Sequence, residues 1–167
     1  MFFILYVFSL YAFETYLIFK KKEQLSKKFK LYKQQTGKDY DTRNLIEIFN
    51  DLNNKDKNVV VAFSPAHHIK DKKNILPLSG ISNSKTIFCN ENGYYSIYQS
   101  DRYGFNNPDS EWDQQEIEYL LIGDSMTHGA CVNRPNDIGS VLRKLSKKPV
   151  LNLGYSGTGP LIEYAVL

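Results

Sequence analysis

A serine in the setting of a nucleophile follows an apolar run in the second half of the chain. Residues 117–122 are apolar or aromatic except for Glu118, and they lead directly into Gly123, Asp124 and Ser125. A short, β-leaning run that ends in a glycine turn predicts a buried strand. Ligands of open α/β sheets bind at the carboxyl ends of the strands. A hydroxyl delivered there is well placed for chemistry, but its position alone does not make it a nucleophile.

Two segments carry a resemblance to a known family. Residues 123–129, Gly-Asp-Ser-x-Thr-x-Gly, resemble the first block of the SGNH, or GDSL-type, serine hydrolases, and residues 150–157 resemble their second block. The resemblance implies that Ser125 is the nucleophile and that the backbone N–H groups of Ser125 and Gly157 bind the developing oxyanion. Gly154 is the fallback for the second donor. Asp124 is expected to brace the turn through local hydrogen bonds.

The general base is the missing part of this apparatus. The family takes a further oxyanion donor from an Asn in a third block and its base from a distant Asp-x-x-His block, and neither follows here. His128 lies three residues after Ser125 and is the one nearby histidine. Such a ring does not easily turn back toward the serine oxygen, so a structural or rim position is the favoured interpretation and the role of base the lesser one.

The elements after Ser125 indicate an α/β fold. Residues 138–145 place apolar side chains on one helical face after a capping Asn136, and residues 149–153 read as the next strand. A strand, helix, strand unit implies a parallel crossover. Together with the resemblance this predicts a three-layer α/β/α SGNH-hydrolase fold with a flavodoxin-like parallel sheet. Because the chain stops inside a helix that begins near Leu161, we expect a truncated, N-terminal portion of the domain.

The N-terminal part predicts a membrane anchor. Residues 1–19 are nearly all apolar or aromatic, and lysines follow directly from Lys20 onward. This favours a single transmembrane helix with the next segment on the cytoplasmic side. A buried or interfacial helix stays open as the alternative, because Glu14 is costly in lipid. Residues 20–56 then read as a basic helical stalk with a break at Thr36 and Gly37.

A leading segment, residues 57–110, connects the stalk to the SGNH-like portion, residues 111–167. It contains a predicted strand at 58–63 and a predicted β-hairpin, in which Asn92-Gly93 supplies the turn. The loop that follows contains Arg102 and Asn106, for which structural contacts are favoured over substrate contacts. His67 and His68 are adjacent and therefore poor partners in one metal site, so we expect surface histidines.

Net charge and cysteine spacing limit the classes of binding partner and metal site that we expect. A net charge of +3 over 167 residues gives no reason to expect a nucleic-acid partner. The mechanism implied by the resemblance needs no cofactor and no metal. Cys89 and Cys131 form no zinc spacing and no disulfide framework, and their redox state stays open.

The resulting hypothesis is a membrane-anchored esterase or acyltransferase that acts through Ser125 on an ester-linked acyl group. Family analogy admits lipids and acylated polysaccharides as substrates. Two alternatives remain. The first is a membrane-tethered, non-catalytic interaction module on the same scaffold. The second is a nucleotide-binding domain, suggested by the glycine-rich loop at Gly154, Gly157 and Gly159, although its spacing departs from G-x-G-x-x-G.

Overall fold

The computed structural model describes residues 2–65 and 76–167. The chain forms two compact units, Met1–Thr42 and Arg43–Leu167. His67 and His68, which the sequence assigns to a surface loop, lie outside the described residues.

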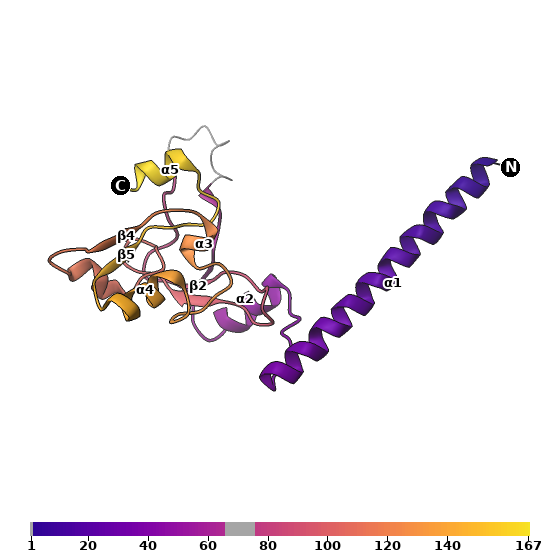
Figure 1. The fold of residues 1–167 in the computed structure, drawn as a ribbon, viewed down its shortest axis with the longest axis horizontal. Helices are drawn as coiled ribbons and strands as arrows, with labels where there is room; N and C mark the ends of the chain where they lie inside the picture. Colours follow the sequence, from indigo (N-terminus) through magenta and orange to yellow (C-terminus); the bar gives the residue numbers. More distant parts are fainter. Residues whose placement is uncertain (1, 66–75) are drawn as a thin grey trace. The chain divides into compact units, whose positions relative to one another are not determined.

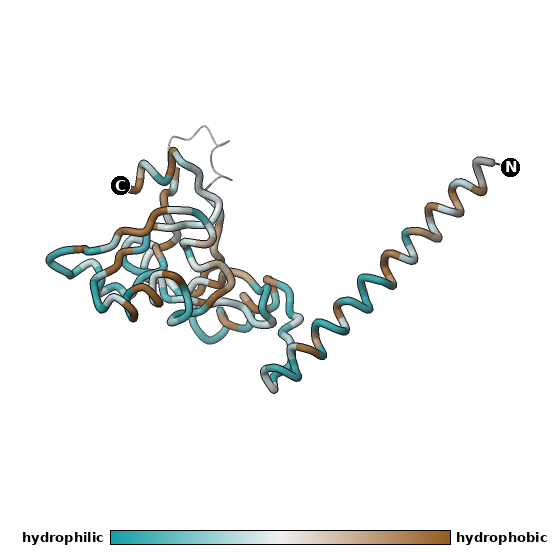
Figure 2. The backbone as a smooth tube through the Cα atoms, in the orientation of Figure 1, coloured by the Kyte–Doolittle hydropathy of each residue, from teal (hydrophilic) through white to brown (hydrophobic). Residues whose placement is uncertain are grey.

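The first unit is dominated by one long helix, α1 (Phe2–Thr36). The predicted break is confirmed, because α1 ends at Thr36 and Gly37 adopts a left-handed φ of +70°. Tyr40 then packs back on Phe29 and Tyr32, with ring centroids 4.7 and 5.4 Å apart. Figure 2 shows apolar residues concentrated in the N-terminal half of α1 and hydrophilic residues in its C-terminal half.

The predicted transmembrane segment at residues 1–19, and with it the single-pass membrane location, is wrong. None of the helices in residues 2–65 and 76–167 combines the length and the apolar character that a bilayer crossing requires. The physical reason lies in the sequence of α1, where Ser9, Glu14 and Thr15 interrupt the apolar run and lysines begin at Lys20.

The second unit begins with a helix and a mixed sheet. The helix α2 (Leu45–Asn53) starts at a capping box, in which the Asn44 side chain accepts from Glu47 N–H and the Glu47 carboxylate accepts from Asn44 N–H. The sheet has the order β1-β2-β3, with β1 (Val59–Val61) parallel to β2 (Lys85–Ile87).

The predicted hairpin is confirmed. Strand β3 (Ile97–Gln99) pairs antiparallel with β2, and the ladder continues from Phe88 N–H to Ser96 O at 2.9 Å. Gly93 has the positive φ, +86°, that the turn requires. This sheet packs on α2 through Ile48, Val59 and Ile87, which form one apolar core.

The elements around Ser125 form a second, smaller sheet. A short 3-10 helix, η2 (Asp109–Asp113), precedes β4 (Tyr119–Leu121), which pairs parallel with β5 (Val150–Asn152). Between these strands lie α3 (Ser125–His128) and α4 (Ile138–Ser146), and after β5 comes α5 (Pro160–Ala165). Figure 1 shows β4 and β5 side by side, with α3 and α4 near them.

The predicted three-layer, flavodoxin-like fold is wrong. The described residues contain one three-stranded mixed sheet and one two-stranded parallel sheet rather than a single parallel core. Two apolar clusters accompany them, one around Ile48 and the other around Phe105 and Tyr155. The sequence located the strands and predicted the pairs β2–β3 and β4–β5. It did not determine that these pairs belong to separate sheets, because that arrangement depends on contacts between distant residues.

Two predicted burial patterns also differ from the structure. Tyr119 and Leu120 of β4 are exposed, and among the described residues β4 is an edge strand beside β5. The apolar face of α4, which includes Ile138, Val141 and Leu145, is exposed as well. The helix instead turns its Gly139 and Arg143 side toward the protein.

Cys89 and Cys131, whose redox state the sequence left open, form a disulfide. Cys89 follows β2 and Cys131 follows α3, so the bond joins the three-stranded sheet to the segment that carries Ser125.

Candidate functional site

Ser125 lies where the sequence predicts it, at the carboxyl end of a strand. It is the first residue of α3 and is partly exposed. Gly123 has a φ of +152°, and a Cβ there would overlap the Thr127 hydroxyl. A residue other than glycine would therefore disturb the turn that presents the serine.

Asp124 occupies the N-cap position of α3 and is exposed. Its side chain makes no capping hydrogen bond, and its carbonyl oxygen accepts from His128 N–H at 2.9 Å. The turn is thus held by the Asp124 backbone.

Gly157 lies in the turn that follows β5. The pairing of β4 with β5 continues beyond the strands, since Tyr155 N–H donates to Gly123 O at 3.0 Å. Ser125 and Gly157 each come two residues after this last paired position. Because the strands are parallel, both residues follow the carboxyl ends of their strands at the same end of the sheet. Both residues that the resemblance selects therefore follow the same end of this sheet.

Gly154 serves a different purpose from Gly157. It is buried, and a Cβ there would lie 2.5 Å from the Thr127 methyl and 2.8 Å from His128 N. Its N–H donates to Asn152 Oδ1 at 2.9 Å. Gly154 permits close packing of α3 on the end of β5, and its amide is already occupied.

His128 is held inside the protein. Its ring is fully buried and stacks between Phe88 and Tyr155, with centroids 4.4 and 4.6 Å away. Nδ1 accepts from Ser156 N–H at 3.1 Å, and Nε2 lies 2.8 Å from the Tyr98 hydroxyl. Both ring nitrogens are occupied, so His128 is not available to take a proton from Ser125.

Burial sets the ionisation of this cluster. Loss of hydration lowers the pKa of His128 from 6.5 to about 4, so the ring is neutral at pH 7. The same cause raises the pKa of Tyr155 to about 12 and the pKa of Tyr98 well above its usual value. An acceptor Nδ1 implies that Nε2 carries the proton and donates to Tyr98.

Ser64 is a site residue that the sequence analysis missed. It follows β1, and its hydroxyl donates to Gly157 O at 3.3 Å. A Cβ on Gly157, which has a φ of +78°, would overlap Ser64 Oγ. In the sequence, Ser64 indicated only the end of a strand. Its contact with Gly157 could not be predicted from a local pattern, because the two residues are 93 positions apart in the chain.

Arg102 and Asn106, for which the sequence favours structural contacts, make such contacts. Arg102 forms ion pairs with Asp109 at 2.7 Å and Asp113 at 2.9 Å. The hydrogen bonds with Asp109 raise the pKa of Arg102 and lower that of the carboxyl group. Asn106 is buried, and its Nδ2 donates to His128 O at 3.0 Å, which supports α3 from behind.

Two hollows occur elsewhere in the second unit. One, of about 420 Å³, is lined by residues 113–116, Glu118, Lys148 and Pro149. The other, of about 670 Å³, lies between α2 and β3 and includes Ile48, Leu52 and Ile97. Ser125 lines neither hollow.

Metal and phosphate ligation find little support in the geometry. Within residues 2–65 and 76–167, no group of three or more His, Cys, Asp or Glu side chains is arranged to hold a metal ion. In the glycine-rich loop, the N–H groups of Gly154 and Ser156 are already bound to Asn152 and His128. These two donors are therefore not available to a nucleotide phosphate. The chain matches no protein-family model, no curated protein and no solved structure at a significant level.

Proposed function

We propose that this chain carries the nucleophile and oxyanion side of a serine-dependent acyl-transfer site. Ser125 attacks the carbonyl carbon of an ester, and the backbone N–H groups of Ser125 and Gly157 bind the oxyanion. The carbon–oxygen bond to the alcohol then breaks, and the alcohol leaves with a proton. Water or another hydroxyl takes the acyl group from Ser125 in the second step, which makes the reaction a hydrolysis or a transfer. The substrate class is an ester-linked acyl group, such as that of a lipid or an acylated polysaccharide.

One observation carries the proposal. Ser125 and Gly157 follow neighbouring parallel strands, at equal distance along the chain from the paired Gly123 and Tyr155. The partly exposed Ser125 and the exposed Gly157 thus both lie just beyond the same end of the sheet. The positive φ of Gly157 and its contact with Ser64 fix the turn, as preorganised oxyanion donors require.

The proton acceptor in this proposal is not His128. It is the one histidine among the described residues, and its two ring nitrogens face Tyr98 and Ser156. The resemblance assigns the base to an Asp-x-x-His block, and these 167 residues do not contain that motif. We therefore expect Ser125 of this chain alone to react slowly unless a base is supplied from solution.

Imidazole can supply that base in a labelling experiment. The chain is incubated with a fluorophosphonate probe, with and without added imidazole, and the modified residue is located by mass spectrometry. We expect imidazole to raise labelling of Ser125 about tenfold, since a diffusible base replaces a positioned one only in part. Ser125→Ala should abolish the imidazole-dependent signal.

Ser110→Ala is the matched control, because Ser110 is exposed and lies outside the site. That variant should be labelled like the wild type. Equal labelling of the wild type and Ser125→Ala, with imidazole present, would remove Ser125 from the nucleophile role.

A non-catalytic interaction module is the second candidate function. The observation in its favour is the outer edge of β4, where Leu120 and Ile122 are exposed and have no neighbouring strand among the described residues. Failure of the labelling experiment, together with binding of a partner at this edge, would favour this function over acyl transfer.

A further inference from the structure

The two edges of β4 differ in their hydrogen bonding. Tyr119 N–H donates to Pro149 O at 3.2 Å, and Leu153 N–H donates to Leu121 O at 2.8 Å. In a parallel ladder, the N–H and C=O of one residue point to the same neighbouring strand, and those of the next residue point the other way. Tyr119 and Leu121 therefore face β5, whereas Leu120 and Ile122 direct their backbone groups outward.

The outward edge of β4 has no strand beside it. Across residues 2–65 and 76–167, the sheet that contains β4 has β5 as its other strand, and no hydrogen bond involves the backbone of Leu120 or Ile122. These two residues are 45% and 37% exposed. An edge with free backbone groups and exposed apolar side chains is a template for another strand.

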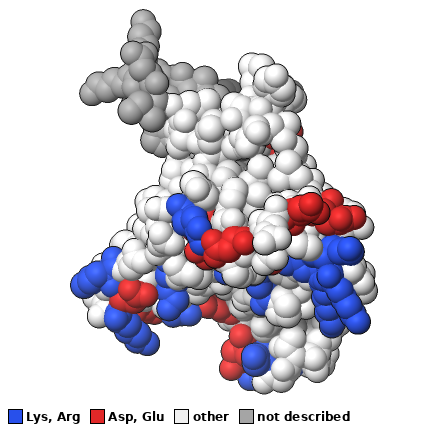
Figure 3. All heavy atoms as spheres, turned by 90° about the vertical axis from the view of Figure 1, so that its left-hand side faces the viewer, with Lys and Arg blue, Asp and Glu red and all other residues white. Residues whose placement is uncertain are grey.

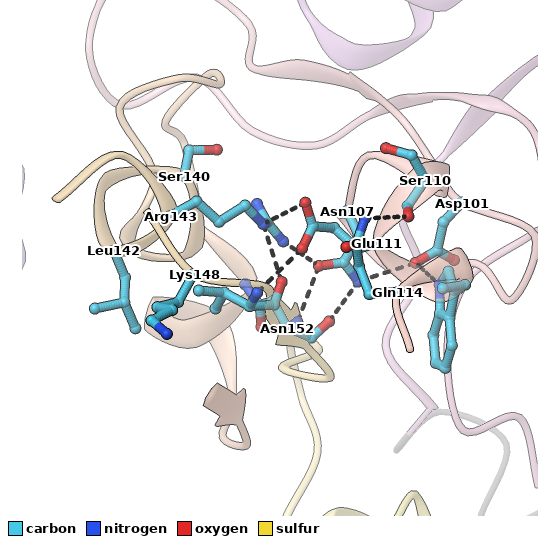
Figure 4. Close-up of polar contacts among 12 residues, drawn as sticks. Asp101, Asn107, Ser110, Glu111, Gln114, Ser140, Leu142, Arg143, Lys148 and Asn152 are labelled. Atoms are coloured by element: carbon cyan, nitrogen blue, oxygen red, sulfur yellow. Dashed lines mark hydrogen bonds and ion pairs between the residues drawn. The ribbon is translucent and has the colours of Figure 1, made fainter. Parts of the chain in front are cut away.

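The opposite edge of the sheet is closed by side chains, as Figure 4 shows. Glu111 accepts from Val150 N–H at 3.0 Å, and Arg143 Nε donates to Val150 O at 2.9 Å. Asn107 accepts from Asn152 N–H at 2.9 Å and donates to Asn152 O at 2.8 Å. These contacts occupy the outward backbone groups of β5, so the edge of β4 is the one that can accept a strand.

Charge selects the kind of strand. Glu116 and Glu118 are exposed at the start of β4 and line the hollow of about 420 Å³ together with Lys148. Neither carboxylate forms a salt bridge within the described residues. Lys148 lies two residues before the first residue of β5. The inner edge of β4 thus accepts a parallel strand with a basic start and an apolar continuation.

We propose that the outer edge of β4 binds an extended segment of a second polypeptide that runs parallel to β4. Lys or Arg residues at the start of that segment lie beside Glu116 and Glu118, and apolar residues follow beside Leu120 and Ile122. The main-chain hydrogen bonds supply affinity, and the acidic start of β4 determines where the basic end of the partner lies. This inference does not depend on the chemistry of Ser125.

A second copy of β4 is a poor occupant of this edge. In a parallel, in-register pairing, Glu116 and Glu118 of one copy would lie beside the same two residues of the other copy. In an antiparallel pairing centred on Leu120, Glu116 of one copy would meet Asp124 of the other. Like charges at directly opposed strand positions are destabilising, so the acidic residues argue against self-association.

Amide hydrogen exchange measured by NMR on the full chain tests the proposal. The probe is a synthetic peptide with the sequence of residues 147–153, which is basic first and then apolar. We expect the peptide to slow exchange at Leu120 and Ile122. Tyr119 and Leu121, already bonded to β5, should stay protected throughout. A peptide with glutamates in place of Lys147 and Lys148 should bind about fivefold more weakly, the equivalent of about 1 kcal/mol.

Two variants sharpen the test. Glu118→Lys should weaken the peptide about fivefold, because it reverses a charge beside the basic end. Glu163→Lys makes the same change on α5 and should leave the affinity unaltered. Leu120→Pro removes one outward donor and should lower binding while the Tyr119 and Leu121 amides stay protected.

Three results would overturn the proposal. The first is saturating peptide without added protection at Leu120 and Ile122. The second is loss of protection at Tyr119 and Leu121, which would mean that the peptide displaces β5. The third is a stable dimer in sedimentation velocity that the Leu120→Pro variant abolishes, which would assign the edge to a second copy of this chain.

Discussion

At the scale of single residues, His128 shows how burial converts a reactive side chain into a structural one. Its neutral ring fills the space between Phe88 and Tyr155 and accepts from Ser156 N–H. That last bond ties α3 to the turn that contains Gly157. The histidine three residues after Ser125 thus holds together the two segments of the site.

The lowered pKa of His128 predicts a loss of stability in acid. In the folded chain the pKa is about 4, compared with 6.5 for an ordinary histidine, so the unfolded chain binds the proton first as the pH falls. The neutral ring contributes fully above pH 6.5, and this contribution disappears between pH 6.5 and 4. The difference corresponds to about 3 kcal/mol in the free energy of unfolding.

Urea unfolding of the wild type and His128→Gln at a series of pH values measures this effect. We expect the wild type to lose stability more steeply than the variant between pH 6.5 and 4. Tyr98 and Tyr155 do not titrate in this range, because burial raises the pKa of both. Parallel pH profiles for the two proteins would contradict the assignment.

At the scale of elements, the small sheet depends on a buried polar network as well as on apolar packing. Asn107, which is 1% exposed, bonds to both backbone groups of Asn152 and also receives Arg143 Nη2 at 2.6 Å. Asp101 accepts from the Asn107 amide and from Trp112 Nε1, each at 2.9 Å. Figure 4 shows these side chains converging on β5. The loop before η2 thereby takes the place of a neighbouring strand.

Removing Asn107 should therefore unfold the second unit more readily. Asn107→Ala leaves the N–H and C=O of Asn152 and a guanidinium N–H of Arg143 unpaired in the interior. We expect a loss of about 3 to 5 kcal/mol in the free energy of unfolding, because each buried orphan group is costly. Chemical denaturation followed by circular dichroism measures the loss.

Asn136→Ala is the matched control, since Asn136 is exposed. We expect that variant to stay within about 0.5 kcal/mol of the wild type. A similarly small effect for Asn107→Ala would show that the network adds little to stability.

At the scale of the whole chain, the second unit consists of two sheets with separate apolar cores. The links between them include the stack of His128 with Phe88 and Tyr155, together with polar and covalent contacts. Ile97 N–H donates to Asn133 Oδ1 at 2.9 Å, and Asn92 Nδ2 donates to Cys131 O at 3.0 Å. The disulfide between Cys89 and Cys131 crosses the same boundary. On the face in Figure 3, both acidic and basic side chains are present.

The disulfide predicts a strong dependence of stability on reductant. It closes a loop of 42 residues, for which the loss of chain entropy in the unfolded state stabilises the fold by about 4 kcal/mol. Adding a phosphine reductant should lower the urea midpoint of the wild type. The double variant Cys89→Ser, Cys131→Ser should have the same urea midpoint as the reduced wild type. Its midpoint should not change when the reductant is added. An unchanged wild-type midpoint would show that the two cysteines do not pair in solution.

The sequence determined what depends on near neighbours. The break at Gly37, the turn at Gly93 and the position of Ser125 after a strand follow from backbone preferences that act over a few residues. The resemblance to SGNH hydrolases likewise selected Ser125 and Gly157, which the structure brings to one end of a sheet.

Tertiary structure alone decided what depends on distant partners. It assigned β4 and β5 to a separate two-stranded sheet, buried His128 among aromatic rings and brought Ser64 to Gly157. It also left the apolar outer edge of β4 uncovered among the described residues. The physical reason is that burial and strand pairing are properties of contacts between segments far apart in the chain, which the pattern of any one segment does not contain.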